Sequence, residues 1–172
     1  KLFFMGTKRP NRSPGKMFAV DEAMALSKEL GLYDRHIFFN DWVAYNERQN
    51  YLLEADLGVS LHLDHIEHRF SFRTRFLDHL WTGLPLLATS GDVMSSELVR
   101  LKLGRTVSAG DVEGVAQAIV EMLADPDLRQ RYLSNLNQVT AQYQWETVVK
   151  PLVQFCANPY FAPDKAHLKT VP

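Results

Sequence analysis

Short apolar runs rich in β-favouring residues alternate along this chain with longer segments in which apolar residues recur every three or four positions. The first pattern predicts strands and the second predicts helices. The predicted strands are residues 2–5, 36–39, 57–63, 86–89 and 105–108. The predicted helices are residues 17–30, 45–54, 72–81, 95–101, 112–123, 126–142 and 145–155. This alternation predicts an α/β fold with a doubly wound parallel sheet and helices on both of its faces.

Signals at the helix ends support two of these predictions. The helix over 112–123 follows Gly110 and Asp111, and its apolar residues form one stripe that faces the core. Asp125 followed by Pro126 is typical of an N-cap with proline at the first helical position. The next helix is therefore predicted to begin there and to continue towards Gln142.

The length and composition favour a single domain. A chain of 172 residues with 46% hydrophobic content can bury one sizeable core and is too short for two. We assign residues 1–157 to this domain and residues 158–172, which contain three prolines, to a C-terminal tail or linker. Because Lys1 leads directly into the first predicted strand, we expect the sequence to be a piece of a longer chain.

The charge and cysteine content exclude several kinds of partner and compartment. The formal net charge is -1, so no overall field would draw the protein to nucleic acid or to an anionic membrane. Cys156 is the only cysteine, which excludes an intramolecular disulfide and fits a reducing cytoplasm. The apolar runs are too short for a membrane span. Recognition of phosphate, if present, must therefore be local.

Three loops follow the first three predicted strands and are the expected ligand-binding region, because doubly wound sheets bind ligands beyond the carboxyl ends of their strands. They are residues 6–15, 40–43 and 64–71. In the first loop, Gly6 allows a close approach of the backbone, and Lys8 and Arg9 can neutralise a diphosphate. The loop lacks the spacing of a P-loop. A solvated basic turn remains the alternative.

The third loop and the residue before it concentrate potential metal ligands, namely His62, Asp64, His65, Glu67 and His68. This set permits a metal-dependent hydrolase as one hypothesis. The spacing is unspecific, however, and alternating residues of an extended segment point in opposite directions. We therefore expect incidental surface histidines and no bound metal.

The predicted helix over 72–81 combines an apolar stripe, which includes Phe72 and Phe76, with a polar stripe that includes Arg75 and Asp78. The polar stripe begins at the helix N-terminus, where free backbone amides favour a phosphate or a carboxylate. The alternative is that Arg75 and Asp78 form only an exposed ion pair.

Residues 70–89 resemble the signature stretch of the donor-binding domain of GT-B-fold glycosyltransferases of family 4, also called group 1. The resemblance rests on an acidic residue, Asp78, followed by the turn Gly83-Leu84-Pro85 and a short strand that ends in Thr89. It extends over most of the chain and implies one Rossmann-like half of a GT-B fold. In the family, another acid stands eight residues upstream of the acid that Asp78 matches. Phe70 stands at that position here, and the nearest upstream acid is Glu67.

The resemblance implies a donor-binding half of a glycosyltransferase, which transfers a sugar from a nucleotide-sugar to an acceptor with retention and without a metal or other cofactor. An N-terminal domain of the same full-length protein would supply the acceptor contacts, so this fragment alone is expected to be inactive. The implied catalytic residues are Lys8, Arg9 and Glu67. The implied donor-binding residues are Gly6, Trp42, Val43, Arg73, Arg75 and Asp78. A non-catalytic nucleotide-binding α/β module remains the alternative from a different class.

Overall fold

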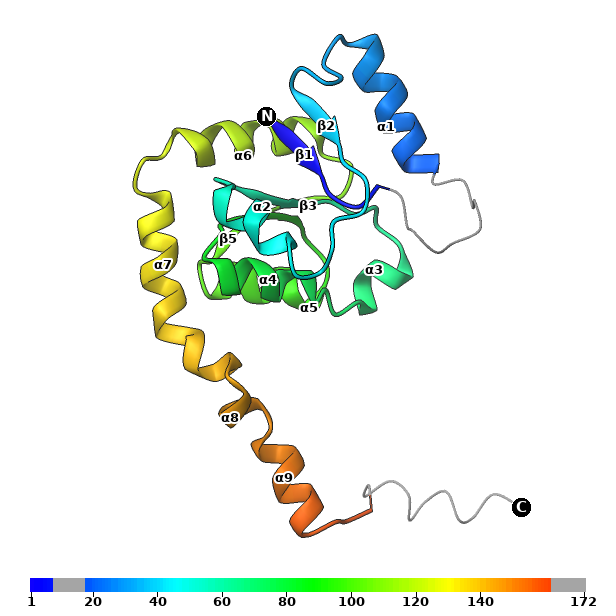
Figure 1. Ribbon diagram of the computed structural model, residues 1–172. Coiled ribbons are helices and arrows are strands. Elements are labelled where there is room, and N and C mark those ends of the chain that lie inside the picture. The colour runs from blue at the N-terminus through cyan, green and yellow to red at the C-terminus, as the bar shows by residue number, and fades with distance from the viewer. Residues whose placement is uncertain (8–17, 162–172) are drawn as a thin grey trace, which may run out of the picture. The chain divides into compact units, whose positions relative to one another are not determined.

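The computed structural model describes residues 1–7 and 18–161 (Figure 1). The chain divides into two compact units, Lys1–Glu54 and Ala55–Pro172. Each unit contains parallel strands and helices that alternate along the sequence. The predicted α/β class is therefore confirmed.

The first unit is built on two parallel strands, β1 (Leu2–Phe4) and β2 (Ile37–Phe39). Their register pairs Phe3 with Phe38 and Phe4 with Phe39, and each pair of rings stacks with centroids 4.8 Å apart. Stacked aromatic pairs on neighbouring strands stabilise a short sheet. Helices α1 (Phe18–Glu29) and α2 (Arg48–Glu54) complete the described part of this unit.

The second unit contains a three-stranded parallel sheet in the order β3 (Gly58–Ser60), β4 (Leu86–Thr89) and β5 (Gly104–Val107). Its helices are α3 (Ile66–Phe70), α4 (Arg75–Thr82), α5 (Val93–Arg100), α6 (Val112–Ala124), α7 (Leu128–Val139), α8 (Trp145–Val148) and α9 (Lys150–Ala157), and a 3₁₀ turn spans Thr140–Tyr143. Each strand except the last is followed by at least one helix before the next strand begins, as a parallel sheet requires.

Strand β4 is fully buried and separates two apolar clusters. Leu86 and Ala88 belong to the cluster that contains side chains of α4, α5 and α7, whereas Leu87 packs with Ala118 and Met122 of α6. Because alternate residues of a strand point to opposite faces, helices cover both sides of this sheet. The two-faced arrangement predicted from the sequence is thus confirmed for the second unit.

The Gly83-Leu84-Pro85 turn connects α4 to β4 directly. Gly83 has a left-handed backbone with φ 64°, and the amide of Leu84 donates to the carbonyl of His79 at 2.9 Å, so the helix ends in a Schellman motif. Pro85 cannot donate to a continuing helix and precedes the first residue of β4. The turn therefore determines where the helix that carries Asp78 ends and where the buried strand begins.

Two predicted boundaries around α4 were wrong. Helix α4 begins at Arg75, so Phe72 lies outside it and is 58% exposed instead of joining an apolar stripe. The predicted loop over 64–71 contains α3, a helix of five residues in which the ring of His65 accepts from the amide of His68. A helix of this length is too short to show a hydrophobic period.

The C-terminal helices also differ from the prediction. Asp125 caps the end of α6 and accepts from the amide of Asp127, so α7 begins at Leu128 and not at Pro126. The single helix predicted over 145–155 is divided at Val149 into α8 and α9, because Pro151 has no amide hydrogen to continue the first helix. In the described part of the chain, none of the helices is long and apolar enough to cross a membrane.

His79 is a partly buried side chain of α4 in the second unit. Its ring lies against Gly58, where an added Cβ would stand only 2.4 Å from the ring, so β3 needs a glycine at this position. The Nδ1 atom is buried without a hydrogen-bond partner. Burial lowers the pKa of His79 to about 4, because the charged imidazolium loses its hydration in this position.

We predict that His79 makes the fold less stable in acid. The unfolded chain binds a proton below about pH 6.5, whereas folded His79 does not until about pH 4, so stability is lost as the pH falls through this window. His79→Met should remove about 2 kcal/mol of the stability difference between about pH 7.5 and pH 4.5, measured by urea unfolding. An unchanged pH dependence in the variant would contradict this prediction.

Candidate functional site

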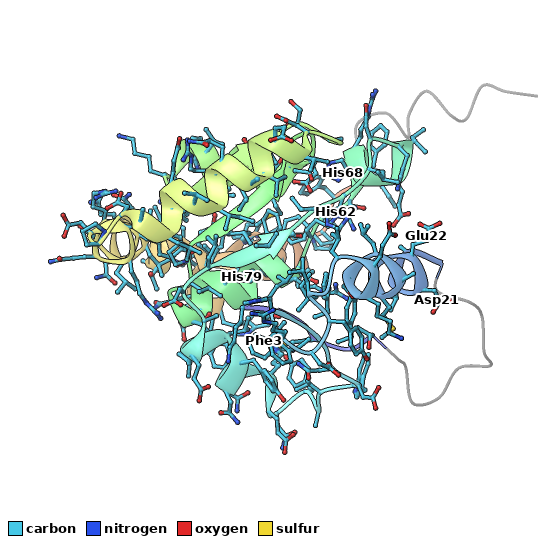
Figure 2. The ribbon with its side chains drawn as sticks, turned by 90° about the horizontal axis from the view of Figure 1, so that it is seen from above. Phe3, Asp21, Glu22, His62, His68 and His79 are labelled. Atoms are coloured by element: carbon cyan, nitrogen blue, oxygen red, sulfur yellow. The ribbon has the colours of Figure 1, made fainter. Side chains whose placement is uncertain are left out.

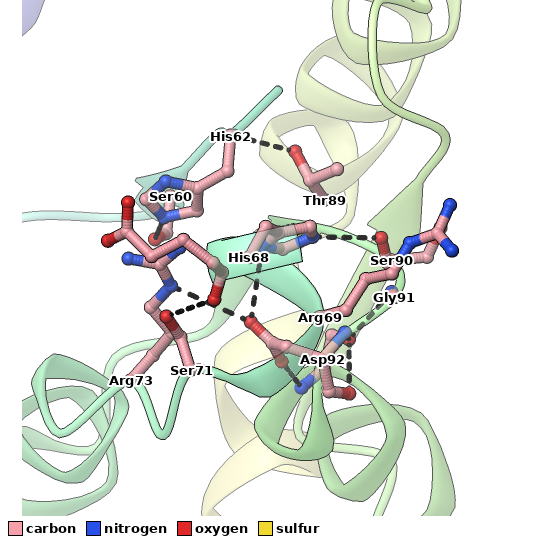
Figure 3. A network of polar contacts seen from close by, with 12 residues as sticks. Ser60, His62, His68, Arg69, Ser71, Arg73, Thr89, Ser90, Gly91 and Asp92 are labelled. Carbon is pink, nitrogen blue, oxygen red and sulfur yellow. Dashed lines mark hydrogen bonds and ion pairs between the residues drawn. The ribbon is translucent and has the colours of Figure 1, made fainter. Parts of the chain in front are cut away.

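A group of three polar side chains, which we call the His–Asp–Arg cluster, lies beside the carboxyl ends of β3 and β4 in the second unit (Figure 3). It consists of His68 on α3, Arg73 in the connection between α3 and α4, and Asp92 at the start of α5. The Oδ2 atom of Asp92 lies 3.7 Å from Nδ1 of His68 and 3.9 Å from Nε of Arg73. The carboxylate therefore faces an imidazole ring and a guanidinium group from two other segments.

Asp92 is held in place by its own helix. It is the N-cap of α5, and its Oδ1 accepts from the amide of Ser95 at 2.6 Å. The hydroxyl of Ser95 accepts in turn from the amide of Asp92, which completes a capping box. The side chains of Asp92 and His68 are each only 1% exposed, and a carboxylate buried this deeply needs cationic partners.

His68 connects α3 to the loop that follows β4. Its Nε2 lies 3.1 Å from the backbone carbonyl of Ser90, which can only accept, so this nitrogen carries the donated hydrogen. Gly91 lies against the same ring. The His68 side chain therefore binds both the backbone and the acidic side chain of the segment from Ser90 to Asp92.

His62 joins the ends of the two strands. Its amide donates to the hydroxyl of Thr89 at 2.9 Å, and its ring stacks on His68 with centroids 5.4 Å apart. Figure 2 shows these two histidines together and away from His79. Burial, followed by the positive charges of Arg73 and His68, lowers the pKa of His62. His62 is therefore neutral near pH 7, and the charge of the site resides in the His–Asp–Arg cluster.

Arg73 is the member of the cluster that is accessible to a ligand. Its side chain is 21% exposed, while its Nε faces the buried carboxylate. An arginine that is oriented by one carboxylate presents its remaining donors in a fixed plane, which suits a phosphate or a diphosphate. The arrangement can therefore bind an anion at the end of the sheet.

The site residues predicted in the second unit lie on α3 and near the start of α4. Arg73 and Arg75 lie at the start of α4, and Asp78 lies in its first turn, partly buried. Glu67 is exposed on α3, three residues before Phe70, which is 83% exposed. Residues three apart on a helix share one face, so Glu67 and Phe70 lie side by side. The turn of helix α3, and not a bulged loop, therefore brings Glu67 beside Phe70, which stands where the family has its upstream acid.

The predicted residues of the first unit lie on two loops that are bonded to each other. The amide of Gly6 donates to the carbonyl of Asp41 at 3.1 Å, and the hydroxyl of Thr7 donates to the carbonyl of Asn40 at 2.7 Å. The ring of Trp42 lies over Gly6 and is 54% exposed, and Val43 is half-buried. Lys8 and Arg9 fall outside the described residues.

The sequence prediction missed Asp92 and treated His68 only as a possible metal ligand. A capping-box signal, Asp92 followed three residues later by Ser95, was available directly after a predicted strand. Within residues 1–7 and 18–161, no three His, Cys, Asp or Glu side chains converge as metal ligands. The two ring nitrogens of His68 instead face a backbone carbonyl and a carboxylate.

Comparison with proteins of known sequence gives one partial match. No protein-family model matches the chain. A phosphatidyl-myo-inositol mannosyltransferase from Mycobacterium leprae is 27% identical over 84 residues, which make up 49% of this chain and 22% of that protein. The chain therefore spans about a fifth of the length of this relative.

Three solved structures share the fold. Sucrose-phosphate synthase from Thermosynechococcus elongatus has a TM-score of 0.72 and 21% identity, over 91% of this chain and 37% of that chain. WaaG, a glycosyltransferase involved in lipopolysaccharide biosynthesis, has a TM-score of 0.65 and 18% identity, over 92% and 38%. The C-terminal domain of LpcC, a group 1 family glycosyl transferase from Francisella tularensis, has a TM-score of 0.62 and 21% identity, over 77% and 66%. The resemblance inferred from the sequence is thus confirmed at the level of the fold, and this chain has the fold of GT-B glycosyltransferases.

Proposed function

We propose that this chain is the donor-binding part of a glycosyltransferase that transfers a sugar from a nucleotide-sugar to an acceptor. The observation that carries the proposal is the position of Asp78. It lies in the first turn of α4, which ends at the Gly83-Leu84-Pro85 turn and leads into a buried strand, in a fold shared with glycosyltransferases. The named activities of these proteins differ, so we propose a class of donor and not one sugar.

In the second unit, the proposed roles follow from the charge of each side chain. Asp78 accepts hydrogen bonds from the ribose hydroxyls, and a charged acceptor makes these bonds strong. Arg73 and Arg75 bind the donor phosphates beside the start of α4. Glu67 orients the sugar in place of the acid that Phe70 replaces, a role supported by their common helical turn.

In the first unit, Gly6, Lys8 and Arg9 follow β1, and Trp42 and Val43 follow β2. We assign the diphosphate to Lys8 and Arg9, with Gly6 allowing a close approach of the backbone. We assign the nucleobase to Trp42 and Val43, and the exposed ring of Trp42 supports a stacking role.

The proposed reaction breaks the bond between the anomeric carbon and the diphosphate oxygen and forms a bond from that carbon to an acceptor oxygen. The nucleoside diphosphate leaves with the bonding electron pair, and the acceptor hydroxyl loses its proton. We propose that Lys8 and Arg9 stabilise the negative charge that develops on the leaving group, without a metal. We propose retention of configuration at the anomeric carbon.

The acceptor contacts are proposed to come from an N-terminal domain of the same full-length protein. The support for this is that the chain covers 37% and 38% of the lengths of the first two structures that it matches. Without that domain, the chain binds a donor but transfers the sugar slowly or not at all.

We predict that the chain binds at least one of UDP, GDP and ADP, or a corresponding nucleotide-sugar, in isothermal titration calorimetry. Asp78→Ala should weaken that binding about tenfold or more, because the ribose loses a charged hydrogen-bond acceptor. Asp78→Glu should retain it, since the longer acid restores the residue found in the family. Glu113→Ala, which removes an exposed first-turn acid from α6, serves as the matched control and should change nothing.

Two results would refute this proposal. One is the absence of saturable binding to every nucleotide tested. The other is binding that Asp78→Ala weakens no more than Glu113→Ala does, because Asp78 would then have no part in the site.

A separate prediction concerns Lys8. Lys8→Ala should weaken binding of the nucleoside diphosphate by about tenfold and leave binding of the matching nucleoside unchanged, since only the diphosphate carries the charge that lysine neutralises. Lys28→Ala, an exposed lysine in the last turn of α1, is the control. Equal weakening of nucleoside and diphosphate would show that Lys8 does not act on the phosphates.

A further inference from the structure

A small cavity borders the larger apolar cluster of the second unit and is lined by side chains of α4, β4, α5 and α7. Its volume is about 10 Å³, which is close to what one water molecule needs. Most of its wall is apolar, but four polar side chains also line it, namely His79, Glu97, Tyr132 and Tyr143. Fully apolar cavities stay dry, whereas a cavity with several polar groups in its wall can hold water.

Two of these four side chains need a hydrogen-bond partner. Oη of Tyr132 and Nδ1 of His79 are both buried, and neither has a partner among the residues that the structure describes. Glu97 accepts from Nε of Arg100 at 3.0 Å, and Tyr143 is 36% exposed. Because an unpaired buried polar atom destabilises a fold, the atoms of Tyr132 and His79 point to a small ligand that bonds with both.

The hydrogen-bonding capacities of the two atoms are complementary through one water. Burial raises the pKa of Tyr132, so its hydroxyl keeps its hydrogen and can donate. Burial lowers the pKa of His79 to about 4, so the ring is neutral near pH 7, and Nδ1 is an acceptor when the ring hydrogen is on Nε2. A water molecule can accept the hydrogen of the hydroxyl and donate one of its own to the imidazole.

We propose that this cavity is a binding site for one water molecule, which accepts a hydrogen bond from Oη of Tyr132 and donates one to Nδ1 of His79. Tyr132 lies on α7 and His79 lies on α4, so the water joins these two helices through a polar bridge inside the apolar cluster. Helix α4 is also the helix that carries Asp78. The water belongs to the fold without a ligand and does not depend on the proposed function.

A high-resolution crystal structure of the chain tests the site directly. It should show one ordered water at about 2.7–3.2 Å from both Oη of Tyr132 and Nδ1 of His79. A direct hydrogen bond between the two side chains, or a cavity without an ordered water, would overturn the proposal.

Urea unfolding near pH 7, where His79 is neutral, tests the bridge in solution. Tyr132→Phe should raise the equilibrium constant of unfolding about fivefold, because the water loses the hydroxyl that donates to it. Tyr143→Phe removes a hydroxyl from a more exposed tyrosine of the same cavity wall, serves as the matched control and should change the constant little. If Oη of Tyr132 is simply unpaired, Tyr132→Phe will leave the constant unchanged or lower it, and the proposal fails.

A double-mutant cycle separates one shared water from two independent contacts. In a His79→Met background, confirmed as folded by circular dichroism, Tyr132→Phe should change the constant by less than about twofold, because the water has already lost its acceptor. An effect of Tyr132→Phe that keeps its full size in this background would overturn the bridge between the two helices.

Discussion

The buried carboxylate of Asp92 is the constraint on which the end of the second sheet depends. A carboxylate with 1% exposure is tolerated only when hydrogen bonds and opposite charges replace its water. Ser95 supplies the hydrogen bond from within α5, Arg73 supplies the opposite charge from the connection to α4, and the ring of His68 on α3 covers the carboxylate. One side chain thus brings α3 and the connection that follows it to the start of α5, beside the end of β4. The ordering of these segments is what gives the candidate site a defined shape.

The fully buried strand β4 also fixes the position of Asp78, because it follows the helix that carries this residue. Apolar residues on both faces fix the strand, and the Gly83-Leu84-Pro85 turn allows only three residues between the strand and α4. The position of α4, and with it Asp78 in its first turn, follows from the packing of its neighbour. Just before the same helix begins, Arg73 lies 3.9 Å from the carboxylate of Asp92. Apolar packing therefore fixes the position of Asp78, and the contact with Asp92 fixes the position of Arg73.

The sequence predicted the fold best for elements whose apolar pattern matches a buried face in the structure. The strand over 86–89 was predicted with its observed bounds, because a short apolar run between a Gly-Pro turn and a polar loop has few other interpretations. Helix α3 and the His–Asp–Arg cluster could not be found in this way. A helix of five residues has no period, and the pairing of His68 with Asp92 joins residues 24 positions apart, which only the folded sheet brings together. Phe70 was identified as a departure from the family pattern, but the helical turn that places Glu67 beside it was not.

The central claim is that a nucleotide donor binds where Asp78 and Arg73 converge on the start of α4. The most direct test is a crystal structure of this chain with the nucleoside diphosphate that it binds most tightly. The account predicts ribose hydroxyls within hydrogen-bonding distance of the Asp78 carboxylate, and phosphate oxygens bound by Arg73 while its Nε remains on Asp92. A nucleotide bound at another surface, with Asp78 and Arg73 both out of its reach, would contradict it.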